Sequence, residues 1–299
     1  MSNRGKGYTF AVLSACLSGA NYVLGKVALA DLSPSHLVAL IFSIAAILQA
    51  YWISKTRQWG DFRKCTLRGW LHVLLFSNFS IIALWTLWAG IKNLDPTVAS
   101  FISRLQTPVT VLLGIYLLHE RFRIYEGIGG IVVILGVVVI YATFDFRLSV
   151  WFWVMVASGV LFGLTEVSAK IALRHLAPEP LSFLRTLLVA VFFLILCSLK
   201  GIPLLNLGHC WWIVLAIALM GPTLSRLFYL FALKYLDVSK AALVNQVQPV
   251  FVAVVAFTFL RTIPTLRAWI GGILIVTGCF VMIAGKERIH RFLRNSLNG

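Results

Sequence analysis

The sequence predicts an all-α polytopic membrane protein with ten transmembrane helices arranged as two inverted five-helix repeats. Three observations predict this fold: the composition, the lengths of the apolar segments and an internal repeat. Hydrophobic residues make up 60% of the 299 residues and charged residues 12%, whereas soluble proteins average about 45–50% and about 25%. A chain with so few charges cannot cover a water-facing surface, which excludes a soluble enzyme and a disordered protein.

The apolar residues fall into ten segments of about 20 residues, the length that a helix needs to cross a bilayer core about 30 Å thick. The expected spans are 8–30, 34–54, 67–90, 96–118, 125–144, 150–173, 180–200, 211–233, 239–260 and 265–285. They are too long for membrane-spanning β-strands and lack their alternation. The connections are short, so the chain has no room for a soluble domain between the spans.

The basic residues predict how the chain is oriented. With the N-terminus inside, the inner connections hold sixteen of the 26 Lys and Arg residues and the outer connections hold five. By the positive-inside rule this bias predicts a multi-pass protein of the cytoplasmic membrane with both termini cytoplasmic. The basic tail, 286–299, then faces the anionic inner leaflet, where it anchors the topology. The net charge of +16 therefore indicates a lipid bilayer as partner and not nucleic acid.

The halves 1–144 and 150–285 resemble each other at an offset of 142–144 residues. The matched pairs include Gly19 with Gly163, Lys26 with Lys170, Leu94-Asp95 with Leu236-Asp237, Gln106 with Gln248, and Gly129-Gly130 with Gly271-Gly272. Each half holds five spans, and an odd number means that the second half enters the membrane from the opposite side. Such inverted repeats are typical of carriers that work by alternating access. The paired glycines indicate close helix packing, either within one subunit or across a homodimer.

These residues also carry a resemblance to a known family. The first span around Ser18–Lys26, the run Leu94–Ala99 leading to Gln106–Pro108, and the glycine-rich fifth span are similar to EamA-type carriers of the drug/metabolite transporter superfamily. The second half repeats the pattern. The resemblance implies ten helices, a central cavity near the repeat interface, and in many members export of amino acids or other small metabolites. It says little about the substrate.

Six ionisable residues lie within spans, where a charge is costly without a partner or a wet cavity. Lys26 and Arg185 lie near span ends, and we expect both to reach the interface by snorkelling. Glu166 and Lys170 have the i, i+4 spacing that favours a helical ion pair. Either they form a structural pair, or Glu166 acts as a gate or proton-coupling carboxylate.

Arg104 and Arg226 lie nearest the membrane midplane. An arginine offers a planar fork for carboxylate or phosphate, so we expect both to bind substrate or to gate. The alternative is pairing with backbone carbonyls or with Glu166. Proline frees a backbone carbonyl in a helix, and hinges are therefore expected at Pro108, Pro222 and Pro249.

The further candidate cavity residues are amides and aromatic side chains within spans. They are Asn21, Tyr22, Trp85, Gln106, Tyr229, Asn245 and Gln248. The charge within the spans sums to +4, which favours a small anionic or zwitterionic metabolite, such as an amino-acid-like molecule. The function expected is a secondary transporter, and an exporter by the resemblance. The alternative is a flippase for a lipid-linked or phosphorylated headgroup.

Motifs for other chemistry are missing from the sequence. It contains neither a G-x-x-x-x-G-K-[ST] loop for ATP nor an H-E-x-x-H metal site. The five cysteines lack the spacing of metal ligands. We therefore expect no enzymatic activity, no cofactor and no metal site, with a small-molecule substrate as the soluble partner.

Overall fold

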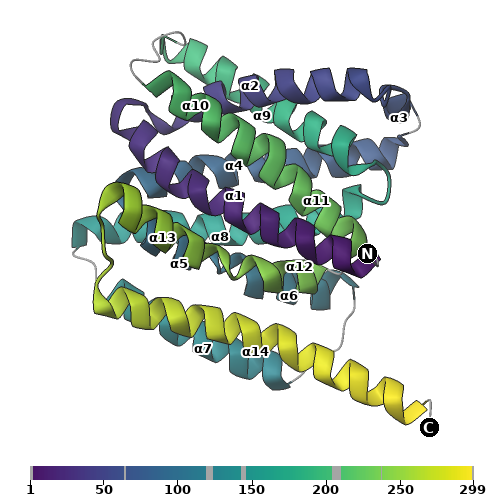
Figure 1. The fold of residues 1–299 in the computed structure, drawn as a ribbon, viewed down its shortest axis with the longest axis vertical. Coiled ribbons are helices and arrows are strands. Elements are labelled where there is room, and N and C mark those ends of the chain that lie inside the picture. Colours follow the sequence, from purple (N-terminus) through teal and green to yellow (C-terminus); the bar gives the residue numbers. More distant parts are fainter. Residues whose placement is uncertain are drawn as a thin grey trace.

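The protein is helical throughout the part of the chain that the structure describes. The computed structural model describes residues 3–63, 65–118, 124–142, 146–203, 210–236 and 238–297, and these ranges contain helices and short connections without β-strands. The helices lie side by side in a stack, with α7 (Ile124–Tyr141) and α14 (Leu266–Leu297) at one end (Figure 1). The expectation of an all-helical protein is confirmed for these residues.

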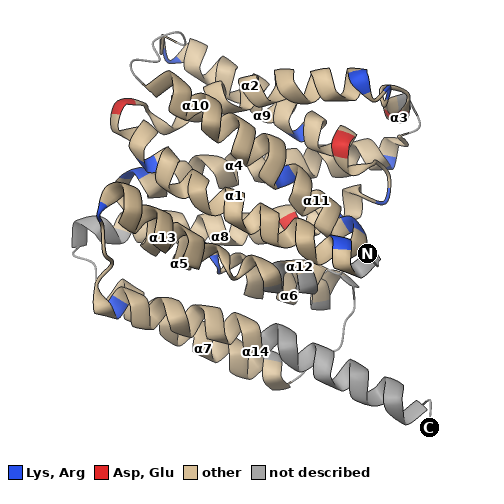
Figure 2. Ribbon diagram, in the orientation of Figure 1, with Lys and Arg blue, Asp and Glu red and all other residues tan. Residues whose placement is uncertain are grey.

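In the part of the chain that the structure describes, six helical segments are long and apolar enough to cross a membrane. They are α1 (Asn3–Asp31), α2 (Pro34–Lys55), α4 (Leu67–Asn93), α8 (Phe146–Ala172), α9 (Pro178–Leu199), and the run of α10 (Trp211–Ala218), η2 (Leu219–Ser225) and α11 (Arg226–Tyr235). Short α3 (Gly60–Arg63) joins α2 to α4. Charged residues gather near the helix ends (Figure 2). Large apolar side chains such as Ile47 and Ile131 are 70% and 61% exposed, as lipid-facing residues would be.

Of the other four predicted spans, two are broken helices, and those over 125–144 and 265–285 have shorter apolar stretches, Gly127–Tyr141 and Leu266–Val281, so ten full-length spans are not confirmed. The span expected over 96–118 divides into α5 (Pro96–Ser103) and α6 (Gln106–Leu118). The span expected over 239–260 divides into α12 (Val238–Asn245) and α13 (Gln248–Leu260). The interruptions expected at Pro108 and Pro249 thus take the form of breaks in these two spans. The breaks fall at matching places in the two halves, just before a proline.

The prolines explain where these helices break. Pro249 has no N–H for the carbonyl of Asn245, four residues earlier, and that oxygen accepts instead from Nη1 of Arg104 at 2.7 Å. Pro108 likewise leaves the carbonyl of Arg104, which accepts from the backbone N–H of Thr107 at 2.9 Å. Each carbonyl that loses its helical partner therefore finds another, as buried backbone groups must.

Pro222 lies inside the π-helical segment η2. The carbonyl that it leaves free belongs to Ala218 and accepts from the Thr223 hydroxyl at 2.8 Å. The Pro222 carbonyl itself accepts from Nε2 of Gln49 on α2 at 2.9 Å. Single π-turns of this kind are frequent at functional sites. Each of the three expected hinge positions therefore lies within or just after an interruption of regular α-helix.

The helices pack in pairs that the internal repeat relates to one another. Helix α1 packs against α11 and α13, while its repeat equivalent α8 packs against α4 and α6. The pairs α2 with α9 and α7 with α14 each join a helix to its own equivalent. The two halves are thus interleaved, with each first helix embedded in the opposite half.

The paired glycines pack within one subunit, between α7 and α14. A Cβ on Gly271 would lie 2.7 Å from the carbonyl oxygen of Gly136, and a Cβ on Gly278 would lie 2.7 Å from that of Gly129. Only glycine permits this backbone approach at these two crossings. Of the two alternatives that the sequence leaves open, packing within the subunit accounts for these contacts.

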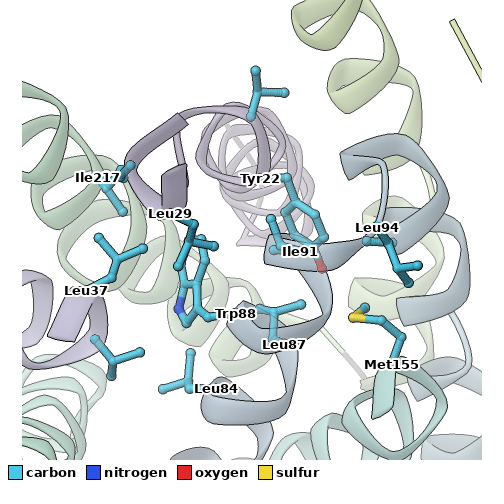
Figure 3. Packing of buried hydrophobic residues seen from close by; sticks show 14 of the residues in the cluster. Tyr22, Leu29, Leu37, Leu84, Leu87, Trp88, Ile91, Leu94, Met155 and Ile217 are labelled. Carbon is cyan, nitrogen blue, oxygen red and sulfur yellow. The ribbon is translucent and has the colours of Figure 1, made fainter. Parts of the chain in front are cut away.

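A large apolar cluster fills the space between α1, α2 and α4. Trp88 lies among Leu29, Leu37, Leu84 and Leu87 (Figure 3). A smaller cluster lies between α4, α8 and α11. The candidate site is a cavity whose wall includes residues of both clusters.

Candidate functional site

A cavity of about 150 Å³ lies between the two halves of the chain. From the first half, its wall includes the predicted residues Asn21, Tyr22, Arg104 and Gln106. From the second half, its wall includes Glu166, Pro222, Arg226, Tyr229, Asn245 and Gln248. Residues far apart in the sequence and assigned to a cavity by residue type are therefore brought together.

Arg104 stands at the break between α5 and α6 and is 1% exposed. Its Nη1 donates to the Asn245 carbonyl at 2.7 Å, and its Nη2 donates to Oε1 of Gln248. Its Nε donates to the Ser100 carbonyl at 3.3 Å and its Nη2 also to the Ser103 hydroxyl at 3.2 Å. The guanidinium is therefore surrounded by protein acceptors, in agreement with the carbonyl-pairing alternative.

A second contact crosses the same junction in the opposite direction. Gln246 stands at the break between α12 and α13, and its Nε2 donates to the Thr107 hydroxyl. Gln246 occupies the repeat position of Arg104. Each broken helix thus sends a side chain from its break to the other. We call the Arg104 and Gln246 contacts together the cross-brace.

Tyr22 adds α1 to this junction. Its hydroxyl donates to the Ser103 hydroxyl at 3.1 Å, next to Arg104. Asn21, one residue earlier, packs against Gly221 of η2, where a Cβ would lie 2.7 Å from the Asn21 amide nitrogen. The first helix therefore contacts both the broken helices and the π-helical segment.

Glu166 of α8 forms an ion pair with Arg226 at the start of α11, with 3.2 Å between Oε1 and Nη1. The side chains are 5% and 12% exposed. The Arg226 guanidinium also lies over the rings of Phe76 and Tyr229, at 5.1 and 5.6 Å from their centroids. Its Nε and Nη2 have no hydrogen-bond partner among the described residues. Glu166 is thus paired across helices and not along its own.

Lys170 of α8 instead extends its side chain to the C-terminal end of α11. Its ammonium donates to the carbonyls of Leu233 and Leu236 at 2.6 and 3.0 Å. Lys26, its repeat equivalent, donates to the carbonyls of Lys92 and Leu94 at the end of α4, at 2.7 and 2.9 Å. A cation at a helix C-terminus satisfies free carbonyls and the helix dipole. The Lys26 side chain therefore reaches the C-terminal end of the neighbouring helix α4, where its ammonium caps free carbonyls.

Three other candidates do not line the cavity. Trp85 is 45% exposed on the outer face of α4, whereas Trp88, almost one turn later, is on the cavity wall. Pro108 and Pro249 lie in the first turns of α6 and α13, just after the breaks that they cause. Hydropathy alone could not separate the faces of α4, because both faces are apolar.

Arg185 of α9 is on the cavity wall, and the expectation that it reaches the interface was wrong. It is 3% exposed, and its Nε donates to the Ser80 hydroxyl at 2.8 Å. Its guanidinium lies over the rings of Phe42 and Phe76, at 5.5 and 5.6 Å. The signal in the sequence was the helical spacing of Ser182, Arg185 and Thr186, which places three polar side chains on one buried face.

The charges on the cavity wall favour an anion. Among the described residues the wall carries three arginines and one carboxylate, Glu166, which leaves an excess of two positive charges. In low dielectric surroundings such an excess attracts a counter-charge strongly. The described residues contain no group of three or more His, Cys, Asp or Glu side chains that could hold a metal ion.

Comparisons with known proteins agree with the fold. A family model described as the EamA-like transporter family matches residues 5–142 and 149–284. One solved structure, named only as "Crystal structure of protein", is 21% identical over 96% of this chain and 98% of that chain, with a TM-score of 0.67. At this identity the likeness shows the fold alone. No curated protein matches the chain.

Proposed function

The chain belongs to the EamA-like transporter family, and we propose that it is a secondary transporter that moves a small anionic or zwitterionic metabolite across the cytoplasmic membrane by alternating access. As a member of this family it is a multi-pass membrane transporter of the drug/metabolite transporter superfamily. Substrate class, direction and mechanism are the proposal, and the direction that we propose is export. The observation that carries it is the basic cavity between the two halves.

The packing of the repeats supports alternating access. The same helix pairs occur twice, related by exchange of the halves, and a repeated unit of five crossings places the second copy upside down. Two such copies can exchange conformations, so that a central cavity opens first to one side and then to the other. We propose residues 1–144 and 150–285 as the two inverted units, with ten crossings in all. Both termini and the tail 286–299 would then be cytoplasmic.

We propose gating roles for the residues of the cross-brace. Arg104, Asn245 and Gln248 tie the two broken helices together, and any movement of one half against the other must shift or break these bonds. Pro108, Pro222 and Pro249 mark the interruptions at which these helices would bend. Lys170 and its equivalent Lys26 would hold the helix ends on opposite faces of the membrane.

We propose that the substrate contacts come from the remaining polar wall. Arg226, Glu166, Asn21 and Tyr229 all face the cavity, and Gln106 and Tyr22 border it at the junction of the broken helices. The volume of the cavity is below the range of about 300–1,000 Å³ that is typical of pockets for drug-sized ligands. A small metabolite fits this space, and the family match gives the flippase alternative no support.

Transport by the purified protein in liposomes tests this function. A metabolite-wide thermal-shift screen first selects ligands, and each is then loaded at high concentration inside proteoliposomes that receive a labelled trace outside. A carrier exchanges the label across the membrane, whereas protein-free liposomes do not. If no ligand that stabilises the protein is exchanged, the proposed function is wrong.

A further inference from the structure

The three arginines of the cavity differ in how their charges are met. The Arg104 guanidinium donates to four acceptors of the protein. Arg226 is paired with the carboxylate of Glu166. Arg185 has one hydrogen bond, from Nε to the Ser80 hydroxyl, and no carboxylate within ion-pair distance among the described residues. Neither Arg104 nor Arg185 is paired with a carboxylate, but the Arg104 guanidinium has four acceptors and that of Arg185 has one, so Arg185 is the arginine with the fewest partners.

The position of Arg185 is fixed although its charge is not neutralised. Ser80 also donates to the Phe76 carbonyl at 2.7 Å, so the serine does not need the arginine as a partner. Phe42 and Phe76 contact the guanidinium through their ring faces, which attract a cation without cancelling its charge. Arg185 is part of the cavity wall. Its Nη1 atom is buried and has no hydrogen-bond partner among the described residues.

A buried guanidinium with a free N–H is costly unless something binds to it. Nε and Nη2 of Arg226 also lack partners in the described part of the chain, and the charges of Arg185 and Arg226 are close enough to repel each other. A carboxylate and a phosphate both match several arginine N–H donors in geometry and in charge, and the small volume of the cavity favours the smaller of the two, the carboxylate.

The rest of the cavity wall indicates the chemistry of the other parts of the substrate. Apolar side chains of Ile41, Leu84, Leu87, Phe162 and Ile217 surround the space, and they favour a compact hydrocarbon body. Two acceptors on the same wall, Oδ1 of Asn21 and Oε2 of Glu166, also lack partners among the described residues. A hydroxyl or an ammonium group of the substrate could donate to them equally well. The net charge of the cavity therefore has to distinguish a hydroxyl-bearing anion from a zwitterion.

Resting on the proposed function, we infer that the substrate is a small apolar carboxylate with a net negative charge, and that Arg185 is the residue that binds its carboxylate. A zwitterion would leave the excess of two positive charges in the cavity unchanged, whereas a monoanion halves it. Glu166 already neutralises Arg226, so a substrate ammonium at the free Oε2 would add a positive charge beside the Arg226 guanidinium, which repels it. The acceptor on Asn21 is then suited to a hydroxyl group on the anion.

Three probes with one hydrocarbon body test the charge of the substrate. They are 2-hydroxy-4-methylpentanoate, which is an anion, leucine, which is a zwitterion, and 3-methylbutylamine, which is a cation. Binding of each to the full-length purified protein is measured by calorimetry at pH 7. The proposal expects the anion to bind most tightly and the amine not at all. Leucine binding as tightly as the anion, or no binding of the anion, would overturn it.

Substitutions then test the residue. Arg185→Met keeps the apolar stem against Phe42 and Phe76 but removes the charge, and Arg185→Lys keeps the charge without the fork. Arg185→Met removes the protein's partner of the bound carboxylate, and because such a loss in a buried charge pair is costly, we expect anion binding to weaken about 30-fold or more. Arg185→Lys should retain the preference for the anion with a smaller loss. Lys200→Gln, at the exposed end of the same helix, is the control and should bind as the wild type does.

The melting temperature without ligand separates binding from a structural role. Removing an uncompensated charge should leave the melting temperature of Arg185→Met unchanged or raised, as is common for binding residues that cost stability. A structural arginine would instead lower it. Unweakened anion binding in Arg185→Met, or a lowered melting temperature with unchanged affinity, contradicts the assignment. Exchange of other metabolites in liposomes would still support the proposed function, so the two claims fail separately.

Discussion

The Nη1 of Arg104 donates to the carbonyl of Asn245 at 2.7 Å, although the two residues are 141 positions apart. The contact joins the breaks of two helices that the internal repeat makes equivalent. It exists because Pro249 cannot donate to that carbonyl. One proline in the second half thus creates the acceptor for a buried arginine of the first half.

Removing Arg104 should weaken the junction of the broken helices. Arg104→Gln leaves the Asn245 carbonyl and the Gln248 side chain without a donor, and a buried unsatisfied group costs about 1–3 kcal/mol. We expect a lower melting temperature and loss of exchange in liposomes, with membrane insertion intact. Arg267→Gln, which alters an exposed residue on α14, is the matched control. Wild-type exchange by Arg104→Gln would exclude a gating role.

The pair of Glu166 and Arg226 should show strong coupling in a double-mutant cycle. Either single change, Glu166→Gln or Arg226→Gln, leaves one buried charge unpaired, which costs about 3–5 kcal/mol when a buried pair is broken. The double variant leaves neither charge and should be more stable than both single variants. Thermal unfolding of the four proteins measures this. Additive effects of the two changes would show that the ion pair contributes nothing.

The two lysine caps should affect opposite faces of the protein. Lys26→Met and Lys170→Met each remove a cation from a helix C-terminus, an interaction that contributes up to about 2 kcal/mol when partly buried. We expect a small loss of stability in each. Lys26→Met should favour opening on the outer side and Lys170→Met on the cytoplasmic side.

Side-specific labelling measures the effect of the lysine caps. Single cysteines placed at cavity positions Ser18 and Ser225 are treated with a membrane-impermeant maleimide from each side in both variants. Arg267→Gln, which alters an exposed residue in the first turn of α14, serves as the control that removes a cation without removing one from a helix C-terminus. Increased labelling from the same side in both variants would contradict the proposed roles.

The sequence predicts most of the architecture because hydrophobic length and charge placement are local properties. The six long segments, the three helix interruptions at proline and ten of the predicted wall residues follow from the order of residue types along the chain. The exact residues at which the two broken spans stop could not be predicted, because the hydropathy of both spans continues through the breaks. The position of each break depends on the donor that the freed carbonyl finds in the folded protein, and the sequence does not show that donor.

The partners of charged residues depend on tertiary structure. Spacing along one helix favours Lys170 for Glu166, whereas packing of α8 against α11 provides Arg226. Distance from the span end suggests snorkelling for Arg185, but the direction of its side chain is set by the face of α9 that packs against α2. A sequence gives the depth of a charge more readily than the direction in which it points.

Labelling the ends of two equivalent helices tests the central claim, the inversion of the repeats, most directly. Asn93 ends α4, and Lys234 is in the last turn of α11; both side chains are exposed. A membrane-impermeant maleimide should label Asn93→Cys only from outside the cell and Lys234→Cys only from the cytoplasmic side. If both cysteines are labelled from the same side, the two halves are not inverted and alternating access around the shared cavity is contradicted.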